Sequence, residues 1–134
     1  MEHNIDQDEI NDYKSTKGNI TVRAEITLFD TWELYITRTG PNAFNIRLLS
    51  VESTSYESWM AVITGTKDSC VVCGSNNDKD IAIIRKKENT YVLMLGCGDV
   101  FIDFHIPADD LDEPLLQVIT FAQKYGLAFN DRDN

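Results

Sequence analysis

A chain of 134 residues with 43% hydrophobic and 25% charged residues has the size and composition of one globular domain, which we place at 1–134. Its formal net charge of −10 disfavours binding to nucleic acid or to anionic membranes and favours a basic protein partner. The start of the chain does not resemble an export signal, and three cysteines do not suggest a disulfide framework. We therefore expect a reduced, cytoplasmic protein.

Residues 1–17 are polar and acidic, and they predict an N-terminal arm or a short helix. From Ile20 the pattern changes to strict alternation of apolar and polar residues, which is typical of a half-buried antiparallel strand. To keep the apolar residues of the next strand on the same face, we expect Leu28 to lie opposite Trp32. The same reasoning places Phe44 opposite Arg38 across a turn at 40–42.

Further strands are predicted over 59–65, 69–74, 81–87, 90–96 and 99–106, with a Ser-rich loop at 50–58. Two-residue turns are expected at 88–89 and 97–98. All strands can be connected in meander order. The sequence therefore predicts one antiparallel sheet of about seven or eight strands over 20–106.

The last part of the chain changes to helical periodicity. An apolar stripe at helical spacing, acidic residues at its start and Gly126 as a stop signal predict a helix over 109–126 that packs on the sheet. A frayed tail is expected at 127–134. The predicted fold class is α+β, with one C-terminal helix.

The predicted strands after residue 80 carry apolar residues on both faces. One face holds Ala82, Ile84, Tyr91, Leu93, Leu95, Val100, Ile102 and Phe104, and the other holds Ile81, Ile83, Val92, Met94 and Phe101. Because one helix can cover only one face, the second set needs a strongly curled sheet, a homodimer partner or a bound target to cover it. We expect strong curling.

Cys70 and Cys73 form the only motif-like spacing in the chain. In a strand, residues three apart point to opposite faces, so these two sulfurs are not expected to share a metal ion. No helix follows them to activate a redox pair, and Cys97 and His105 are expected far apart at strand rise. The sequence therefore predicts packing cysteines, with no metal and no cofactor.

Asp103 and His105 are two residues apart and share one face of the last predicted strand. Val92 is expected to lie opposite both Arg85 and Asp103, which would bring Arg85 near this pair. A catalytic dyad is one interpretation, but a solvated polar surface is the more common outcome for such residues. We therefore do not expect an enzyme.

The leading functional hypothesis is a small acidic protein that neutralises a basic protein partner, such as a toxin nuclease domain, in the manner of an immunity protein. The alternatives are an anti-defence mimic of nucleic acid, a ligand-holding curled sheet or barrel and, least favoured, an enzyme. The expected partner-binding residues are Arg85, Asp103, His105, Asp109, Asp110, Asp112 and Glu113, with Ile83, Val92, Met94 and Phe101 as an apolar contact face.

Overall fold

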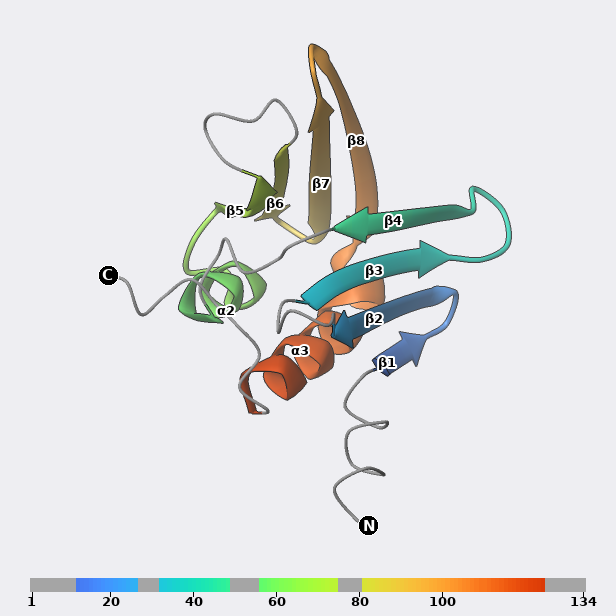
Figure 1. Cartoon of the computed structure of the whole chain (residues 1–134), viewed down its shortest axis with the longest axis vertical. Helices are drawn as coiled ribbons and strands as arrows, with labels where there is room; N and C mark the ends of the chain where they lie inside the picture. Colours follow the sequence, from blue (N-terminus) through green and yellow to red (C-terminus); the bar gives the residue numbers. More distant parts are fainter. Residues whose placement is uncertain (1–11, 27–31, 49–55, 75–80, 125–134) are drawn as a thin grey trace.

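The computed structural model describes residues 12–26, 32–48, 56–74 and 81–124, which form two blocks of four strands followed by one helix (Figure 1). The first block is β1 (Asp12–Lys17), β2 (Ile20–Ile26), β3 (Trp32–Arg38), β4 (Phe44–Leu48) and α2 (Tyr56–Thr64). The second is β5 (Ser69–Gly74), β6 (Ile81–Lys87), β7 (Thr90–Cys97), β8 (Val100–Pro107) and α3 (Ala108–Lys124).

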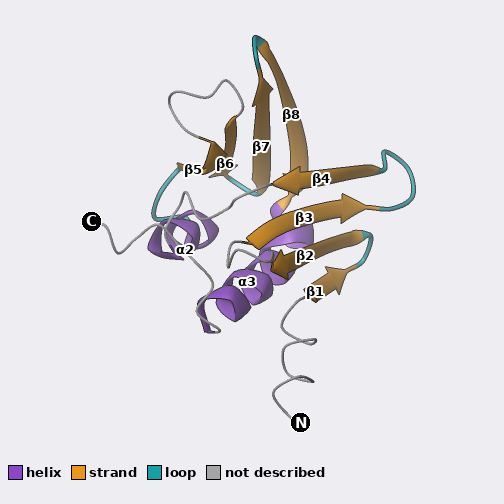
Figure 2. Cartoon of the chain, viewed as in Figure 1, coloured by secondary structure: helices purple, strands orange, loops and turns teal. Residues whose placement is uncertain are grey.

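The strands form two antiparallel sheets of four strands each, in the orders β1-β2-β3-β4 and β5-β6-β7-β8 (Figure 2). The α+β class, the antiparallel pairing and the meander order are confirmed. The single sheet and the strong curl are wrong, since the chain divides the strands into two sheets and neither is closed or strongly curled. The division falls at α2, where the sequence predicted a strand.

Residues 56–64 form a helix, which corrects both the predicted loop at 50–58 in its last residues and the predicted strand at 59–65. The remaining loop positions, 50–55, lie outside the described residues. Gly65, at φ 88°, ends this helix: its N–H donates to the Val62 carbonyl, and the Thr66 N–H donates to the Ala61 carbonyl. This pair of bonds is the Schellman motif of helix C-termini.

β1 replaces the predicted arm or short helix over its six residues, and positions 1–11 lie outside the described residues. Its sequence is almost wholly polar, so pairing with β2 and contact with α3 stabilise it. The Tyr13 ring stacks on Phe121 with 4.1 Å between centroids, and Ser15 Oγ donates to Gln117 Oε1. Tertiary contact thus determines this strand.

The pairing in the first sheet agrees with one predicted strand register and differs from another. Phe44 lies opposite Arg38, as predicted. Trp32 lies opposite Ile26 and not Leu28, so that prediction is wrong by two residues, a shift that preserves the alternation of the pairing.

α3 crosses the inner face of the first sheet, mainly over β1 and β2, and also touches β7, β8 and α2, while α2 covers β5 and β6 (Figure 1). α3 begins one residue before the predicted start, and 125–134 lie outside the described residues. Together the helices and both sheets bury one continuous apolar core, whose largest members include Trp59, Tyr91, Leu34, Leu111 and Leu115. No helix in the described ranges has the length and apolar character needed to span a membrane.

Candidate functional site

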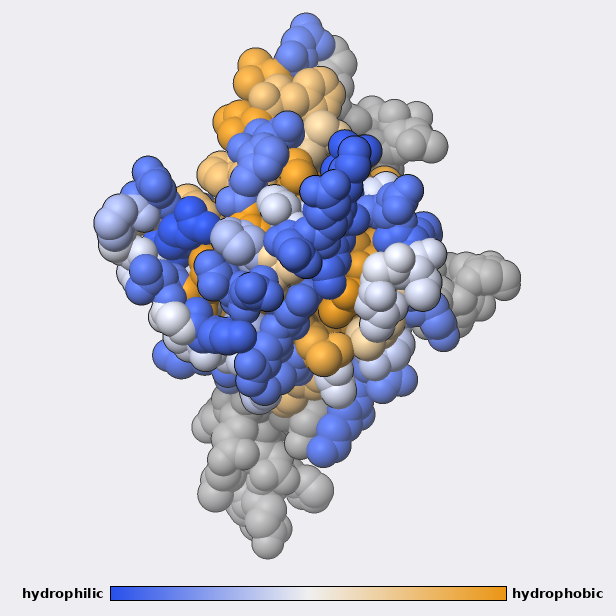
Figure 3. Space-filling view, turned by 180° about the vertical axis from the view of Figure 1, so that it is seen from behind, coloured by the Kyte–Doolittle hydropathy of each residue, from blue (hydrophilic) through white to orange (hydrophobic). Residues whose placement is uncertain are grey.

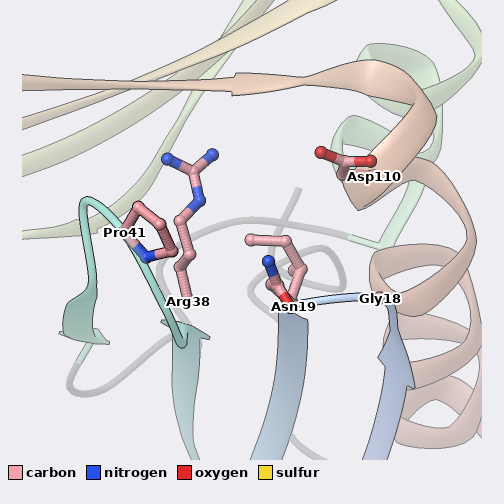
Figure 4. Close-up of a pocket in the computed structure, with 6 residues that line it drawn as sticks. Gly18, Asn19, Arg38, Pro41 and Asp110 are labelled. Carbon is pink, nitrogen blue, oxygen red and sulfur yellow. The ribbon is translucent and has the colours of Figure 1, made fainter.

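An open pocket lies where two turns of the first sheet meet the start of α3 (Figure 4). Its volume is about 380 Å³, and Gly18, Asn19, Ile20, Arg38, Pro41 and Asp110 line it. The side chains of Arg38 and Asp110 stand on opposite sides of the opening. The pocket therefore presents one cationic and one anionic group to whatever enters it.

Backbone contacts fix the elements that carry this pocket. Gly18 adopts φ 60° in the β1–β2 turn, a conformation that glycine accepts without strain. The Asn19 carbonyl accepts a hydrogen bond from the Thr39 N–H at 3.0 Å, which joins that turn to the end of β3. The Ala108 N–H donates to the Asn89 carbonyl at 2.7 Å, which attaches the start of α3 to the β6–β7 turn. The pocket is therefore built on ordered elements.

Asp110 belongs to the first turn of α3, where the helix dipole favours negative charge. Within the described residues, neither Asp109 nor Asp110 forms an ion pair, and both are exposed. Glu113 lies 3.9 Å from Lys17, but both side chains are at least half exposed, so this pair contributes little. The start of α3 thus holds three acids available to a partner, which we call the α3 acidic site: Asp109, Asp110 and Glu113.

Asp112 has a different role from the three other acids with which the sequence grouped it. Its Oδ1 accepts hydrogen bonds from Lys86 Nζ at 3.0 Å and from the Tyr91 hydroxyl at 2.5 Å. Lys86 Nζ also donates to the Ile63 carbonyl at the end of α2, at 2.7 Å. This network joins both helices to the second sheet, so Asp112 is occupied by contacts within the fold.

The network predicts a loss of stability in alkaline solution. Burial raises the pKa of Tyr91 above its usual value of 10.0, and the hydrogen bond to Asp112 raises it further. Because the folded state holds this proton more tightly than the unfolded state, the stabilisation is complete below about pH 10 and is lost as the pH rises above it. Urea midpoints across this range should fall more steeply for the wild type than for Tyr91→Phe. Parallel pH profiles for the two proteins would contradict this assignment.

The expected Asp103–His105–Arg85 grouping does not form a contact network. All three side chains are exposed, and no hydrogen bond or ion pair joins them among the described residues. Arg85 does lie opposite Val92, as predicted, but Val92 pairs with His105 while Asp103 pairs with Met94. The shift arises because the β7–β8 turn consists of Gly98 and Asp99, one residue later than predicted.

The second apolar face of the β5–β8 sheet is partly covered. Ile83, Val92 and Met94 are half-buried, whereas Phe101 is 59% exposed. A Cβ built on Gly96 would lie 2.7 Å from the Phe101 ring, so the ring packs closely on this glycine. Near the hairpin end, the apolar surface is open to solvent (Figure 3).

The cysteine prediction rested on unbroken alternation from Cys70 to Cys73, and a bulge interrupts the pairing of β5 with β6 within this stretch. A bulge between Val71 and Cys73 places Cys73 opposite Ala82, whereas Cys70 lies opposite Ile84. Cys70 is buried, and the side chains of Cys73 and Cys97 lie outside the described part of the structure. No group of three His, Cys, Asp or Glu side chains suited to a metal ion occurs in the ranges that the structure describes.

Most of the acidic excess lies outside the described ranges. Within them, twelve Asp and Glu residues face ten Lys and Arg residues, which leaves −2 of the −10 charges of the chain. The described part of the chain therefore carries little net charge, and its acidic residues matter through local clusters such as the α3 acidic site.

Sequence reasoning missed the pocket residues other than Asp110. The turns at Gly18-Asn19 and Gly40-Pro41 were signals for two hairpin turns at one end of the first sheet. Nothing in the sequence indicated that α3 would begin beside them.

Comparison with protein-family models found no matching family, and comparisons with curated proteins and with solved structures found no match either.

Proposed function

We propose that this chain is a binding protein that neutralises a basic protein partner, and that the α3 acidic site receives a basic side chain of that partner. The observation that carries this proposal is the Asp110 carboxylate, which faces an open pocket without an ion-pair partner among the described residues. Charge-assisted hydrogen bonds to such a carboxylate are among the stronger contacts that an interface can form.

Arg38 gives the pocket a second recognition group. Its guanidinium lies 5.0 Å from the centre of the Phe44 ring, which supports one face of the group. The edge of a guanidinium carries donors suited to a carbonyl or carboxylate oxygen. A polypeptide that places a basic side chain on Asp110 and a backbone carbonyl on Arg38 would satisfy both groups.

The surroundings of the pocket favour a protein over a small molecule. The pocket is near the lower end of the size range of small-ligand sites, and it is open. Asp109 in the first turn of α3 and Glu113 in the next turn lie outside it, so charge complementarity extends beyond the pocket. A bound partner of protein size can contact all three acids, which would both steer association and fix orientation.

The test is a residue-resolved NMR titration with an acetylated, amidated tri-arginine peptide. We expect saturable shifts at the backbone amides of Asn19, Arg38 and residues 108–113. Shifts confined to the acidic residues of 1–12 and 131–133 would contradict the proposal, because they would show that the peptide follows bulk charge and not the site. The comparison thus separates a local site from the net charge of −10.

Asp110→Asn should remove the shifts at the site, since asparagine keeps the size of the side chain and its compatibility with a helix start while losing the charge. The matched control is Glu57→Gln, which changes an exposed acid in the first turn of α2. We expect the control to bind as the wild type does. Equal loss in both variants would show that the site has no special role.

A further inference from the structure

β8 is the outer strand of the β5–β8 sheet, and its first residues expose apolar side chains. Val100, Phe101 and Ile102 are 60%, 59% and 52% exposed. The β7–β8 hairpin projects beyond the rest of the described molecule, so no described element covers the outer half of β8 (Figures 1 and 3). Consecutive exposed large apolar residues on an outer strand are typical of a surface that pairs with another chain.

Within the described structure, β8 has unpaired backbone N–H and C=O groups along the edge that faces away from β7. Cys97 and Val100 close a two-residue turn, so the even-numbered residues of β8 face β7 with their N–H and C=O groups. The backbone groups of Phe101, Asp103 and His105 then point to the open edge. Outer strands are commonly protected by lysine, proline or a bulge, and β8 has none of these between Val100 and Ile106. By contrast, α3 packs on β1, the outer strand of the other sheet.

We propose that β8 pairs with β8 of a second copy of this chain, antiparallel, about a two-fold axis that passes at Ile102. The two β5–β8 sheets then join into one sheet of eight strands. This inference does not depend on the α3 acidic site, and it uses the strand edge rather than the half-buried second face.

Repulsion between like charges disfavours the two registers on either side of this one. A two-fold axis perpendicular to the sheet keeps each side chain on its own face when it passes through a residue of β8. The possible registers therefore differ in which residue of β8 lies on the axis. An axis at Phe101 places Asp99 opposite Asp103, and an axis at Asp103 places the two Asp103 side chains opposite each other; like charges in these positions are unfavourable. An axis at Ile102 places Asp99 opposite His105 of the partner subunit.

Apolar complementarity supports the same register. With the axis at Ile102, the two Ile102 side chains meet at the centre, and Val100 lies opposite Phe104 of the partner subunit on both sides of the axis. Within each chain, Phe104 already packs against Phe44 of β4, with 5.4 Å between ring centroids. The self-paired strands would therefore cover exposed Val100 and Ile102 with a continuous apolar ladder.

Cysteine cross-linking tests the register directly. In the proposed dimer, Ile102→Cys brings two new cysteines opposite each other, at a separation suited to a disulfide. Val100→Cys is the matched control, because that residue faces Phe104 of the partner subunit. After mild oxidation, we expect a 102–102 linked peptide by mass spectrometry and no 100–100 linked peptide. Absence of the 102–102 link, or a 100–100 link of equal yield, would overturn the register.

Sedimentation of the full chain tests the dimer itself. We expect a dimer for the wild type and a monomer for Ile102→Lys, because lysine on an edge strand opposes pairing. Val71→Lys is the control, since Val71 is also apolar and 40% exposed but lies on β5. We expect this control to remain dimeric, with unchanged circular dichroism in both variants. A monomeric wild type, or a dimer that survives Ile102→Lys, would overturn the proposal without affecting the α3 acidic site.

Discussion

Replacing Asp112 by alanine is expected to lower the free energy of unfolding by about 2 kcal/mol, a larger effect than at any other acid of α3. The change removes the acceptor of both Lys86 and Tyr91, and it leaves the ammonium of Lys86, whose side chain is only 16% exposed, without its carboxylate. Breaking a fully buried pair costs about 3–5 kcal/mol, and we expect less here because the Asp112 side chain is 42% exposed. Urea unfolding followed by circular dichroism measures the difference.

Asp109→Ala is the control for this experiment, since Asp109 is exposed on the same helix and has no ion pair in the described structure. We expect it to change stability by less than about 0.5 kcal/mol. In a double-mutant cycle, we expect the loss of stability in the double variant Asp112→Ala, Tyr91→Phe to be smaller than the sum of the losses in the two single variants. Additive effects would show that the two side chains do not cooperate, and equal effects of Asp109→Ala and Asp112→Ala would contradict the network.

Trp59→Ala should produce the largest loss of stability, about 3–5 kcal/mol. Trp59 lies on α2, is 0% exposed and is among the largest buried side chains of the core. Its Nε1 has no hydrogen-bond partner in the described structure, so the expected loss comes from burial and packing alone. The measurement is again the free energy of unfolding in urea.

Glu57→Ala on the exposed side of α2 is the control, and we expect a change within about 0.5 kcal/mol. A small effect of Trp59→Ala would mean that α2 does not pack against the sheets as described. Such a result would also count against the division of the strands into two sheets, because α2 is the element that separates the two sets of strands in the chain.

The candidate site could be predicted only in part. Acidic residues before an apolar helical stripe identified the start of α3, and with it Asp109, Asp110 and Glu113. The sequence could not separate Asp112 from them, because its partners Lys86 and Tyr91 lie more than 20 residues away in the chain. Nor could it place Arg38 near Asp110, since that proximity depends on where α3 crosses the first sheet.

The error at 59–65 has a local explanation. Five consecutive apolar residues, Trp59 to Ile63, fit a buried strand and a buried helix equally well, since neither period is visible in such a run. Gly65 was the available signal, and a glycine after the run is also typical of a turn between strands. Burial against β5, β6 and α3 selected the helix.

By itself, the sequence determined the strands from β2 to β4 and from β5 to β8, their antiparallel meander order, the face that each side chain takes in most of them, and the C-terminal helix. These features follow from period and turn chemistry, which act between near neighbours in the chain. Tertiary structure alone decided the strand at β1, the helix at α2, the division into two sheets and the pocket between Arg38 and Asp110. Each of these depends on contacts between distant segments, and the free energy of such contacts is not encoded in any local pattern.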